Sequence, residues 1–399
     1  MNITELIEID KHYHLNTYGY RTKVSFDYGK GINLWDKENN KYYDFLSGIA
    51  VTALGHSHPK IVSSILEQAT KILHCSNLYY IESQTKLAKL LVENSCADKV
   101  FFANSGAEAN EGAIKLARKY FKDKGFSDKY EIITLKDSFH GRTLATLSAT
   151  GQEKYQKNFT PLMPKFIHVE RNNIEELNNK ISKNTCAIMI EIIQGESGVH
   201  LLSKEYLSHI KKICNNNNIL LIIDEIQTGL GRTGKLFGYQ HFDVEPDIFT
   251  LAKALGNGIP ISALCAKEFV ASSFSIGDHG STFGGNPFVC NVALSVIDVI
   301  LTENISKNSE LMGVYFIECL NHLKNKYNII LEIRGKGLMI AIEIKKNKAK
   351  EIKNLCFDEG FLIGSIGENI LRLLPPLIIE KNDIDKFIEI FEKVLSKFD

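Results

Sequence analysis

The sequence lacks an excess of charge of either sign. Its 399 residues include 47 lysines and arginines against 47 aspartates and glutamates, so the formal net charge is zero with the histidines neutral. A balanced chain offers no broad electrostatic surface to nucleic acid or to an anionic membrane. Small anionic ligands are not excluded, because they need only a few local positive groups.

The sequence also lacks a long apolar run and a recognisable leader. No stretch approaches the ~18 consecutive apolar residues of a membrane-spanning helix. The first eight residues, MNITELIE, are acidic and contain neither the apolar core of a secretory signal nor the arginines of a transit peptide. The eight cysteines are scattered without a C-x-x-C pair, which is typical of reduced thiols. We therefore expect a cytoplasmic protein that binds neither membrane nor nucleic acid.

Short, mostly apolar runs recur along the first two thirds of the chain, and several gaps between them have helical periodicity. The runs do not alternate with polar residues, which is typical of strands buried on both faces. Strand, helix and strand in series predict an α/β fold with a mostly parallel sheet of seven strands. The expected strands are 100–103, 132–135, 166–169, 187–190, 219–223, 248–252 and 261–266.

The pattern changes after Asn286-Pro287, where two long helical segments precede two short strands and a final helix. The segments are 288–301, 306–327, 329–334, 338–344 and 382–397. We expect three units: residues 1–50, which form a hairpin near Gly29 and pack with the last unit; a large domain, 51–286; and a smaller α+β domain, 287–399.

Polar and aromatic side chains follow five of the predicted strands directly. They occur at 104–107, 137–142, Glu191, 224–225 and Lys253. Ligands of an open parallel sheet bind beyond the carboxyl ends of its strands, so these groups are predicted to meet at one rim. Five such strand ends together indicate a built site.

Three of these features have both a functional and a structural interpretation. Ser105-Gly106-Ala107 can cradle a phosphate at a helix N-terminus, or simply cap that helix. Asp224, at the end of an apolar strand, can pair with a cationic ring nitrogen or cap the next turn. Lys253, which follows a buried strand, can form a Schiff base if it is desolvated, although most lysines are merely solvated.

Two other motifs suggest different chemistry. Gly229-Leu-Gly231-Arg-Thr-Gly234 matches the G-x-G-x-x-G fingerprint of nicotinamide enzymes, but five residues separate it from the preceding strand and no helix follows clearly. His56 and His58 could form a metal ligand pair, yet they lie in a predicted turn without further ligands nearby. A nicotinamide oxidoreductase and a catalytically silent binding protein remain the alternatives from other functional classes.

Asp224-Glu-Ile-Gln-Thr-Gly-Leu-Gly-Arg-Thr-Gly234, followed by Lys253, resembles the class III pyridoxal-phosphate aminotransferases, and the resemblance extends over nearly the whole chain. It includes Asn104-Ser-Gly-Ala-Glu-Ala-Asn-Glu, Ser138-Phe-His-Gly-Arg-Thr, Gln194-Gly-Glu-Ser-Gly-Val, His279-Gly-Ser-Thr-Phe-Gly-Gly-Asn-Pro and Leu371-Arg-Leu-Leu-Pro-Pro. The resemblance implies the type I fold of pyridoxal-phosphate enzymes and pyridoxal 5'-phosphate as cofactor. Within the class, the chain is most similar to the enzymes that act on N-acetylornithine.

The resemblance assigns cofactor-binding roles. Lys253 would bind the cofactor covalently and then move the proton, as the main catalytic residue beside Asp224. Asp224 would pair with the ring nitrogen, Gln227 would contact the phenolic oxygen and Phe139 would stack on the ring. The phosphate would lie at Ser105, Gly106 and Ala107, and Thr282 would reach the phosphate of the neighbouring subunit, which implies a homodimer with shared sites.

The resemblance also assigns substrate roles. Arg142 would bind the α-carboxylate of N-acetylornithine, and Arg372 a carboxylate of glutamate or 2-oxoglutarate, because arginine matches a carboxylate fork. Glu196 would pair with Arg372 while the amine is bound. Ser281 and Tyr18 would lie beside the substrate.

The implied reaction moves the δ-amino group of N-acetylornithine to 2-oxoglutarate. Ornithine aminotransferases are expected to have a tyrosine where this chain has Ile49, and its hydroxyl would suit the free α-amino group of ornithine. Isoleucine offers no such partner and so favours the acylated substrate. Ornithine, succinyldiaminopimelate, succinylornithine and 4-aminobutyrate remain alternative amino donors.

Overall fold

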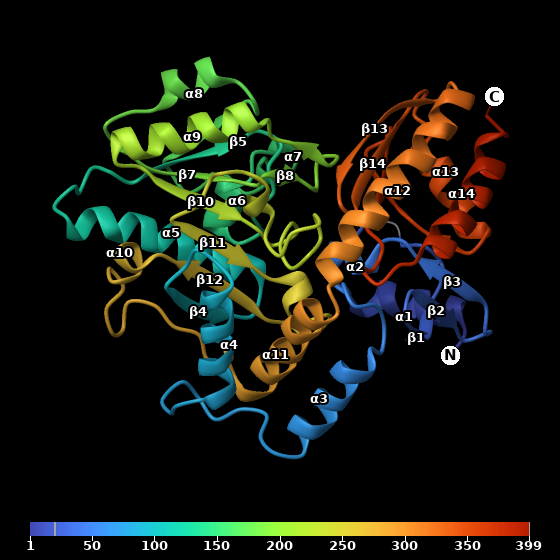
Figure 1. Cartoon of the computed structure of the whole chain (residues 1–399), viewed down its shortest axis with the longest axis horizontal. Coiled ribbons are helices and arrows are strands. Elements are labelled where there is room, and N and C mark those ends of the chain that lie inside the picture. Colours follow the sequence, from blue (N-terminus) through green and yellow to red (C-terminus); the bar gives the residue numbers. More distant parts are fainter. Residues whose placement is uncertain (20, 399) are drawn as a thin grey trace.

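The computed structural model describes residues 1–19 and 21–398. Figure 1 shows a larger part at the left and a smaller part at the right, and both chain termini lie in the smaller part. The C-terminal strands and helices therefore share one side of the molecule with the N-terminal segment (Figure 1).

The larger part is built on a seven-stranded sheet, so the predicted α/β fold is confirmed. The order is β4-β12-β11-β10-β7-β5-β6, and only β12 runs antiparallel to its neighbours. Every predicted apolar run forms one of these strands. They are β4 (Lys99–Ala103), β5 (Glu131–Leu135), β6 (Phe166–Val169), β7 (Thr185–Ile190), β10 (Leu220–Asp224), β11 (Ile248–Leu251) and β12 (Ser262–Ala266).

Helices cover both faces of this sheet because its strands carry apolar side chains on both faces. Helix α5 (Gly106–Asp123) contacts β7, β10, β11 and β12 on one face, and α9 (Lys204–Asn217) contacts β7 and β10. Shorter elements fill the edges and loops. These are α6 (Leu144–Ala149), α7 (Glu153–Gln156), α8 (Ile174–Lys180), β8 (Ile193–Gln194), β9 (His200–Leu201), η1 (Gly238–His241), η2 (Lys253–Leu255) and α10 (Glu268–Ala271).

Helix α11 (Pro287–Thr302) packs against α3 (Pro59–Ala69) and α4 (Glu82–Glu93), and α12 (Ile305–Lys326) leads into the smaller part. There β13 (Ile330–Lys336), β14 (Met339–Ile344), β17 (Ile370–Leu373) and β16 (Gly364–Ile366) form an antiparallel sheet. Helices α13 (Ala349–Asp358) and α14 (Lys381–Leu395) pack on each other beside it. Among the described helices none alone meets the length and composition of a membrane span, and α11 with α12 does so only as a pair bent by 61°.

The N-terminal segment begins with α1 (Ile3–Tyr13) and continues into β1 (Phe26–Lys30), β2 (Asn33–Asp36) and β3 (Lys41–Asp44). The hairpin predicted near Gly29 is β1–β2. Strand β3 pairs in parallel with β15 (Phe361–Leu362), so the sheet includes chain from both ends of the sequence.

The short helix α2 (Ser47–Ala50) is unusual because Ser47, Gly48, Ile49 and Ala50 all have positive φ. For Ile49, a β-branched residue at φ 65°, this backbone is strained. Hydrogen bonds compensate: Asp44 Oδ1 accepts from the amides of Leu46 and Ser47 at 2.9 and 2.7 Å. This left-handed turn leads directly to Val51, which lines the pocket described next.

Candidate active site

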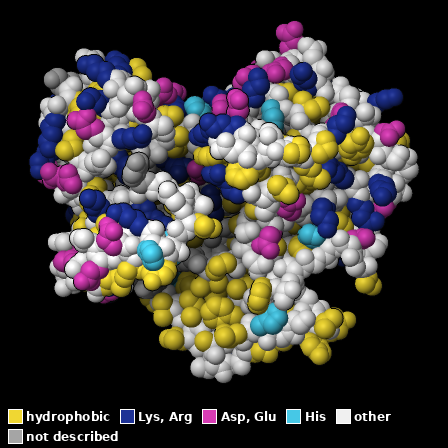
Figure 2. Space-filling model, turned by 180° about the vertical axis from the view of Figure 1, so that it is seen from behind, with side chains coloured by type: hydrophobic (Ala, Val, Ile, Leu, Met, Phe, Trp, Pro, Cys, Tyr) yellow, Lys and Arg dark blue, Asp and Glu magenta, His cyan; other side chains and the backbone are white. Residues whose placement is uncertain are grey.

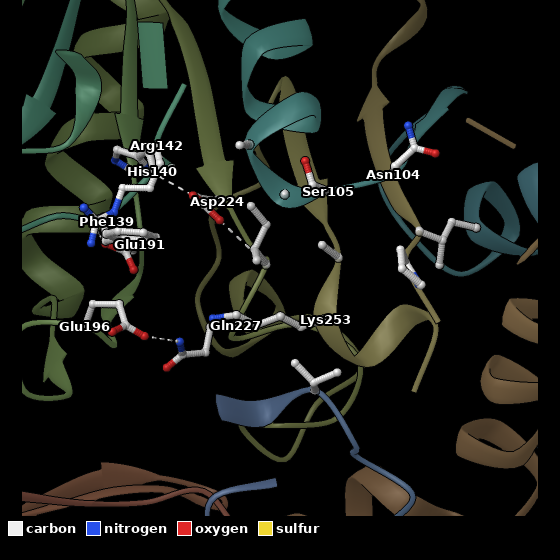
Figure 3. Close-up of a pocket in the computed structure, with 18 of the residues that line it drawn as sticks. Asn104, Ser105, Phe139, His140, Arg142, Glu191, Glu196, Asp224, Gln227 and Lys253 are labelled. Carbon is white, nitrogen blue, oxygen red and sulfur yellow. Dashed lines mark hydrogen bonds and ion pairs between the residues drawn. The ribbon is translucent and has the colours of Figure 1, made fainter. Parts of the chain in front are cut away.

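A pocket of about 450 Å³ opens at the carboxyl ends of the central strands, where the sequence predicts a built site. Figure 3 shows its labelled side chains converging from several loops of the large sheet and from α5. The predicted residues that line it are Ser105, Gly106, Ala107, Phe139, Arg142, Glu196, Asp224, Gln227 and Lys253.

The N-terminus of α5 forms one wall of the pocket. Ser105 is the N-cap, and its hydroxyl accepts from the amide of Glu108 at 3.3 Å. The amides of Gly106 and Ala107, in the first turn, have no intrahelical acceptor by the geometry of a helix start. A Cβ on Gly106 would come 2.7 Å from Ile226 Cδ1, so only glycine keeps this space. Together these features fit a phosphate group.

Asp224 lies at the end of β10 in a closed network. Its Oδ2 accepts from Asn110 Nδ2 at 2.8 Å and lies 2.9 Å from His140 Nδ1. Thr250 Oγ1 in turn donates to Asn110 Oδ1 at 2.8 Å. All four side chains are buried, so the carboxylate is held in one orientation at the pocket floor.

Lys253 begins the short helix η2 directly after β11 and lines the same pocket. Its φ of 41° lies in the left-handed region, which is uncommon for lysine and typical of functional sites. Burial lowers the pKa of its amine, and the nearby Arg372 lowers it further, against the opposing effect of Glu196. A lysine with a lowered pKa supplies the neutral amine that covalent attachment requires.

Glu191 adds a second carboxyl group near Asp224. It is buried and accepts a hydrogen bond from the amide of Phe139 at 2.9 Å. Burial and the neighbouring carboxylate of Asp224 raise its pKa well above the ordinary value. Both effects disfavour the charged form of Glu191.

Glu196 and Arg372 form an ion pair across the mouth of the pocket. Arg372 Nη1, on β17, donates to Glu196 Oε1 at 2.8 Å, and Gln227 Nε2 donates to the same oxygen at 3.3 Å. Burial alone would raise the pKa of Glu196, but Arg372 and Lys253 outweigh it and hold the pKa below its usual range. Gln227 Oε1 and Arg372 Nε are buried without a hydrogen-bond partner in the described chain, which leaves both free for a ligand.

Arg142 also lines the pocket, beside two aromatic rings. Its Cζ is 3.8 Å from the ring centre of Tyr155 and 5.6 Å from that of Phe139. The side chain is exposed, and stacking rather than an ion pair orients it. An exposed, oriented guanidinium is suited to a substrate carboxylate.

Four predicted site residues lie outside the pocket lining; one of them, Arg372, reaches it through Glu196, and the other three are more distant. Tyr18 is 74% exposed in the N-terminal segment, and Thr282 is exposed on a surface loop. Ser281 is tied to the pocket wall through Asn104, whose Nδ2 donates to its hydroxyl at 3.2 Å. The structure of one chain does not bring these three residues to the ligand space.

Sequence reasoning assigned no role to Asn110, His140, Glu191 or Tyr155. A signal was available for three of them. Asn110 and His140 lie within the motifs quoted above, and Glu191 is a polar residue directly after a predicted strand. Tyr155 had no such signal, because α7 brings it to Arg142 only in three dimensions.

Comparisons with known proteins agree with this geometry. The profile of the family described as aminotransferase class III matches residues 17–395. Acetylornithine aminotransferase from Caldanaerobacter subterraneus is 50% identical to this chain over 392 residues, covering 98% of this chain and 99% of the relative.

Two solved structures are similar over the full length. Ornithine aminotransferase from Toxoplasma gondii superposes with a TM-score of 0.96 at 32% identity, covering 100% of this chain and 96% of that one. Acetylornithine aminotransferase from Elizabethkingia anophelis superposes with a TM-score of 0.89 at 35% identity, covering 100% of both chains. The backbone is therefore shared by both kinds of enzyme, and side chains must distinguish their substrates.

Proposed function

This chain belongs to the class III aminotransferases, which depend on pyridoxal 5'-phosphate, and on that premise we propose that it transfers the δ-amino group of N-acetylornithine to 2-oxoglutarate. The products are N-acetylglutamate 5-semialdehyde and glutamate, so the enzyme acts in arginine biosynthesis. The observation that carries the proposal is the pocket lined by Lys253, Asp224, the α5 N-terminus and Arg142, with Arg372 bound to Glu196 of its lining.

The residues of the pocket fit the cofactor. The amides of Gly106 and Ala107 suit its phosphate, while Asp224, fixed by Asn110, suits its ring nitrogen. Oε1 of Gln227 has no hydrogen-bond partner in the described chain and can accept from a phenolic O–H of the cofactor. Phe139, which also lines the pocket, is proposed to stack on the ring.

The bound cofactor supplies an electron-withdrawing ring that accepts the electrons of a substrate C–H bond. Lys253 would hold the cofactor, and its amine, whose pKa is lowered by burial, would act as the base for the proton on the δ-carbon of the donor. Asp224 would hold the ring nitrogen through its carboxylate, which His140 and Asn110 keep in one orientation.

Two arginines bind the substrate carboxylates. Arg142 binds the α-carboxylate of N-acetylornithine, which places the far δ-amine toward Lys253. Arg372 binds a carboxylate of 2-oxoglutarate after Glu196 moves away from it, and Glu196 covers Arg372 while the amine occupies the site. One pocket then accepts two substrates of different charge in turn.

Ile49 supports the acylated donor over free ornithine. It is 37% exposed in the left-handed turn that precedes Val51, and its side chain offers no hydrogen-bonding group to a free α-amine. Ser281 and Tyr18 are proposed to complete the substrate side of the assembled site.

A homodimer is proposed to complete the cofactor site. Figure 2 shows an apolar patch at the bottom of the molecule. The segment 72–80, between α3 and α4 in the lower part of Figure 1, is strongly exposed, with Leu78 at 86% and Tyr80 at 105%. The ring of Phe283, beside Thr282, lies 5.5 Å from that of His74, so Thr282 adjoins this patch. A patch of this kind needs a partner, and a second copy would bring Thr282 to the phosphate of the first.

The proposed units are 1–50, 51–286 and 287–399, with the first packed on the last through the β3–β15 pairing. A cytoplasmic location stays a prediction.

Half-reactions measured by absorbance test the proposed reaction. N-acetylornithine and ornithine are added separately to the holoenzyme without an oxo acid, and the cofactor band is followed. We expect N-acetylornithine to bleach the band at low concentration and ornithine only in large excess. Bleaching by ornithine at equal or lower concentration would assign the enzyme to the ornithine branch, and the Lys253→Ala variant should show no turnover without added amine.

Hybrid dimers test the shared site. Lys253→Ala and Thr282→Ala chains are mixed under conditions that exchange subunits. If each site combines Lys253 of one chain with Thr282 of the other, the hybrid contains one site with both native residues, and activity returns. Unshared sites would leave the hybrid no more active than the Thr282→Ala chain alone.

A further inference from the structure

The motif Gly229–Gly234 has no part in the proposed reaction, yet it carries a fully buried arginine. Arg232 is 1% exposed, and burial lowers the pKa of its guanidinium to about 9, against the opposing effect of Asp44. Its Nη2 is buried without a hydrogen-bond partner in the described chain. Such a group is costly to bury, so its position calls for a specific reason.

The side chain of Arg232 leaves the larger part and binds the smaller one. Nη1 donates to two backbone carbonyls, Leu338 O at 2.9 Å and Pro375 O at 2.6 Å. Leu338 lies between β13 and β14, and Pro375 follows β17. An arginine can serve both carbonyls because it presents several donors in a rigid plane.

The backbone of Arg232 makes matching contacts. Its carbonyl accepts from the amide of Leu338 at 3.0 Å and from the hydroxyl of Ser309, on α12, at 2.9 Å. A Cβ on Gly337 would come within 2.6 Å of the Arg232 carbonyl oxygen, so the backbones of these two segments are in direct contact. Within the motif, Gly231 lies against Leu377 and Gly234 against Glu310, so these two glycines allow close packing between the two parts.

The segment 374–377 receives contacts from three regions of the chain. The amide of Leu374 donates to Phe45 O at 2.7 Å, and its carbonyl accepts from Ser47 Oγ at 2.6 Å. The amide of Leu377 donates to Ala53 O at 2.6 Å. Arg232 supplies the contact at Pro375, between these two.

Arg372 lies in β17, three residues before Pro375. Its guanidinium reaches Gly195 O at 3.1 Å and Glu196 at 2.8 Å, at the mouth of the pocket. Whatever fixes Pro375 therefore fixes where Arg372 stands relative to Lys253, which belongs to the other part of the molecule.

We propose that Arg232 is a positioning residue for the oxo-acid substrate: by holding the Pro375 carbonyl it sets the distance between Arg372 and the rest of the pocket. This inference rests on the proposed function, in which Arg372 binds the dicarboxylate. Arg142, which receives the amine substrate, lines the pocket, and within the described chain no hydrogen bond joins it to the 374–377 segment. The effect of Arg232 is therefore confined to one of the two half-reactions.

The test compares the two half-reactions in the holoenzyme with Arg232→Lys and Arg232→Met. We expect the KM for 2-oxoglutarate to rise at least tenfold, while the apparent affinity for N-acetylornithine and the cofactor absorption change less than twofold. Lysine keeps the charge but cannot bind both carbonyls in one plane, so it should resemble methionine more than arginine. Equal losses in both half-reactions would overturn the proposal.

A binding measurement keeps the inference testable if turnover is lost. The dissociation constant of glutarate, a dicarboxylate without the oxo group, is measured by calorimetry for the wild type, Arg232→Lys, Arg372→Met and the double variant. A positioning role predicts weaker binding in each single variant and no further loss when Arg232→Lys is added to Arg372→Met. Additive losses would contradict it. The milder Ser309→Ala variant, which removes one contact to the Arg232 carbonyl, should shift glutarate binding in the same direction.

Val394→Ala is the matched control. Val394 is buried in α14 of the smaller part and has no hydrogen bond to the 374–377 segment. It should lower stability and leave the ratio of the two half-reactions unchanged. If the wild type binds neither glutarate nor 2-oxoglutarate, the proposed function is wrong. If the wild type binds both and Arg232→Lys binds them equally tightly, only the inference about Arg232 is wrong.

Discussion

Arg372 donates from Nη1 to Glu196 Oε1 at 2.8 Å, so a carboxylate of the chain already occupies the arginine proposed for the oxo acid. The pair is poorly hydrated, with 6% of the Arg372 side chain exposed and 22% of that of Glu196. A dicarboxylate must therefore displace Glu196, while a donor with an uncharged acetyl group leaves the pair intact. Whether this ion pair is broken or intact therefore distinguishes the binding of the two substrates.

Replacing Glu196 with glutamine should tighten dicarboxylate binding. The competing charge is removed, while the amide keeps a similar shape beside Gln227. A charge-assisted hydrogen bond contributes ~1.5–3 kcal/mol, which corresponds to roughly tenfold or more in glutarate affinity at ~1.4 kcal/mol per tenfold. Calorimetric titration with glutarate measures it, and affinity equal to or weaker than that of the wild type would show that Glu196 does not compete.

Replacing Ile49 with tyrosine should shift the donor preference toward ornithine. The phenolic hydroxyl gives the free α-amine a partner, and one hydrogen bond to a charged group is worth roughly tenfold in the ratio of kcat/KM values. Ile49→Phe is the control, since it adds the ring without the hydroxyl. The same shift in both variants would mean that ring size rather than hydrogen bonding decides.

Replacing Asn110 with alanine should loosen Asp224. The change removes the donor to Asp224 Oδ2 and leaves the Thr250 hydroxyl without its acceptor. We expect a loss of about 1–3 kcal/mol in the free energy of unfolding, from unsatisfied buried groups, together with weaker cofactor retention during dialysis. Thr250→Val keeps both contacts of the Asn110 amide nitrogen, so it should retain the cofactor. If it loses cofactor as readily as Asn110→Ala, the contact to Asp224 is not the cause.

His241 should make stability depend on pH. Burial, with the nearby charge of Lys336, lowers its pKa to about 4 in the folded protein, against 6.5 for an ordinary histidine. Between pH 6.5 and 4, His241 is therefore protonated in the unfolded chain and largely neutral in the folded one. Stability is fully present above pH 6.5 and falls as the pH drops through this window. Urea unfolding of wild type and His241→Gln across pH 4–7 should give a flatter profile for the variant, and parallel profiles would exclude His241 as the source.

The large sheet could be predicted because its strands are buried on both faces, which leaves unbroken apolar runs in the sequence. The run 166–169, for example, coincides with β6. The antiparallel direction of β12 could not be predicted, since an apolar run has no direction.

The strand ends also indicated which side chains gather in the pocket, because topology brings carboxyl ends to one edge. Two features could not be predicted for the same physical reason: the groups that stabilise them are distant in the sequence. The left-handed turn at Ile49 contradicts local propensity and is held in part by Ser47 Oγ on Leu374 O. Arg232 is a residue type normally exposed, and only carbonyls of the smaller part explain its burial.

The pairing of β3 with β15 determines which parts of the chain can fold early and which must fold late. Strands β1, β2 and β3 can pair with one another early, but Ser47 and Leu374, which bond beside the β3–β15 pairing, are 327 residues apart, so β3 lacks its second neighbour until nearly all of the protein has been made. Contacts of such separation close slowly, because a long loop must be ordered first. The seven-stranded sheet, whose strands end by Ala266, can fold during synthesis, whereas the turn before Val51 can take its final shape only after release. A chain truncated before Phe361 would therefore keep its cofactor-binding sheet and lack a formed substrate entrance.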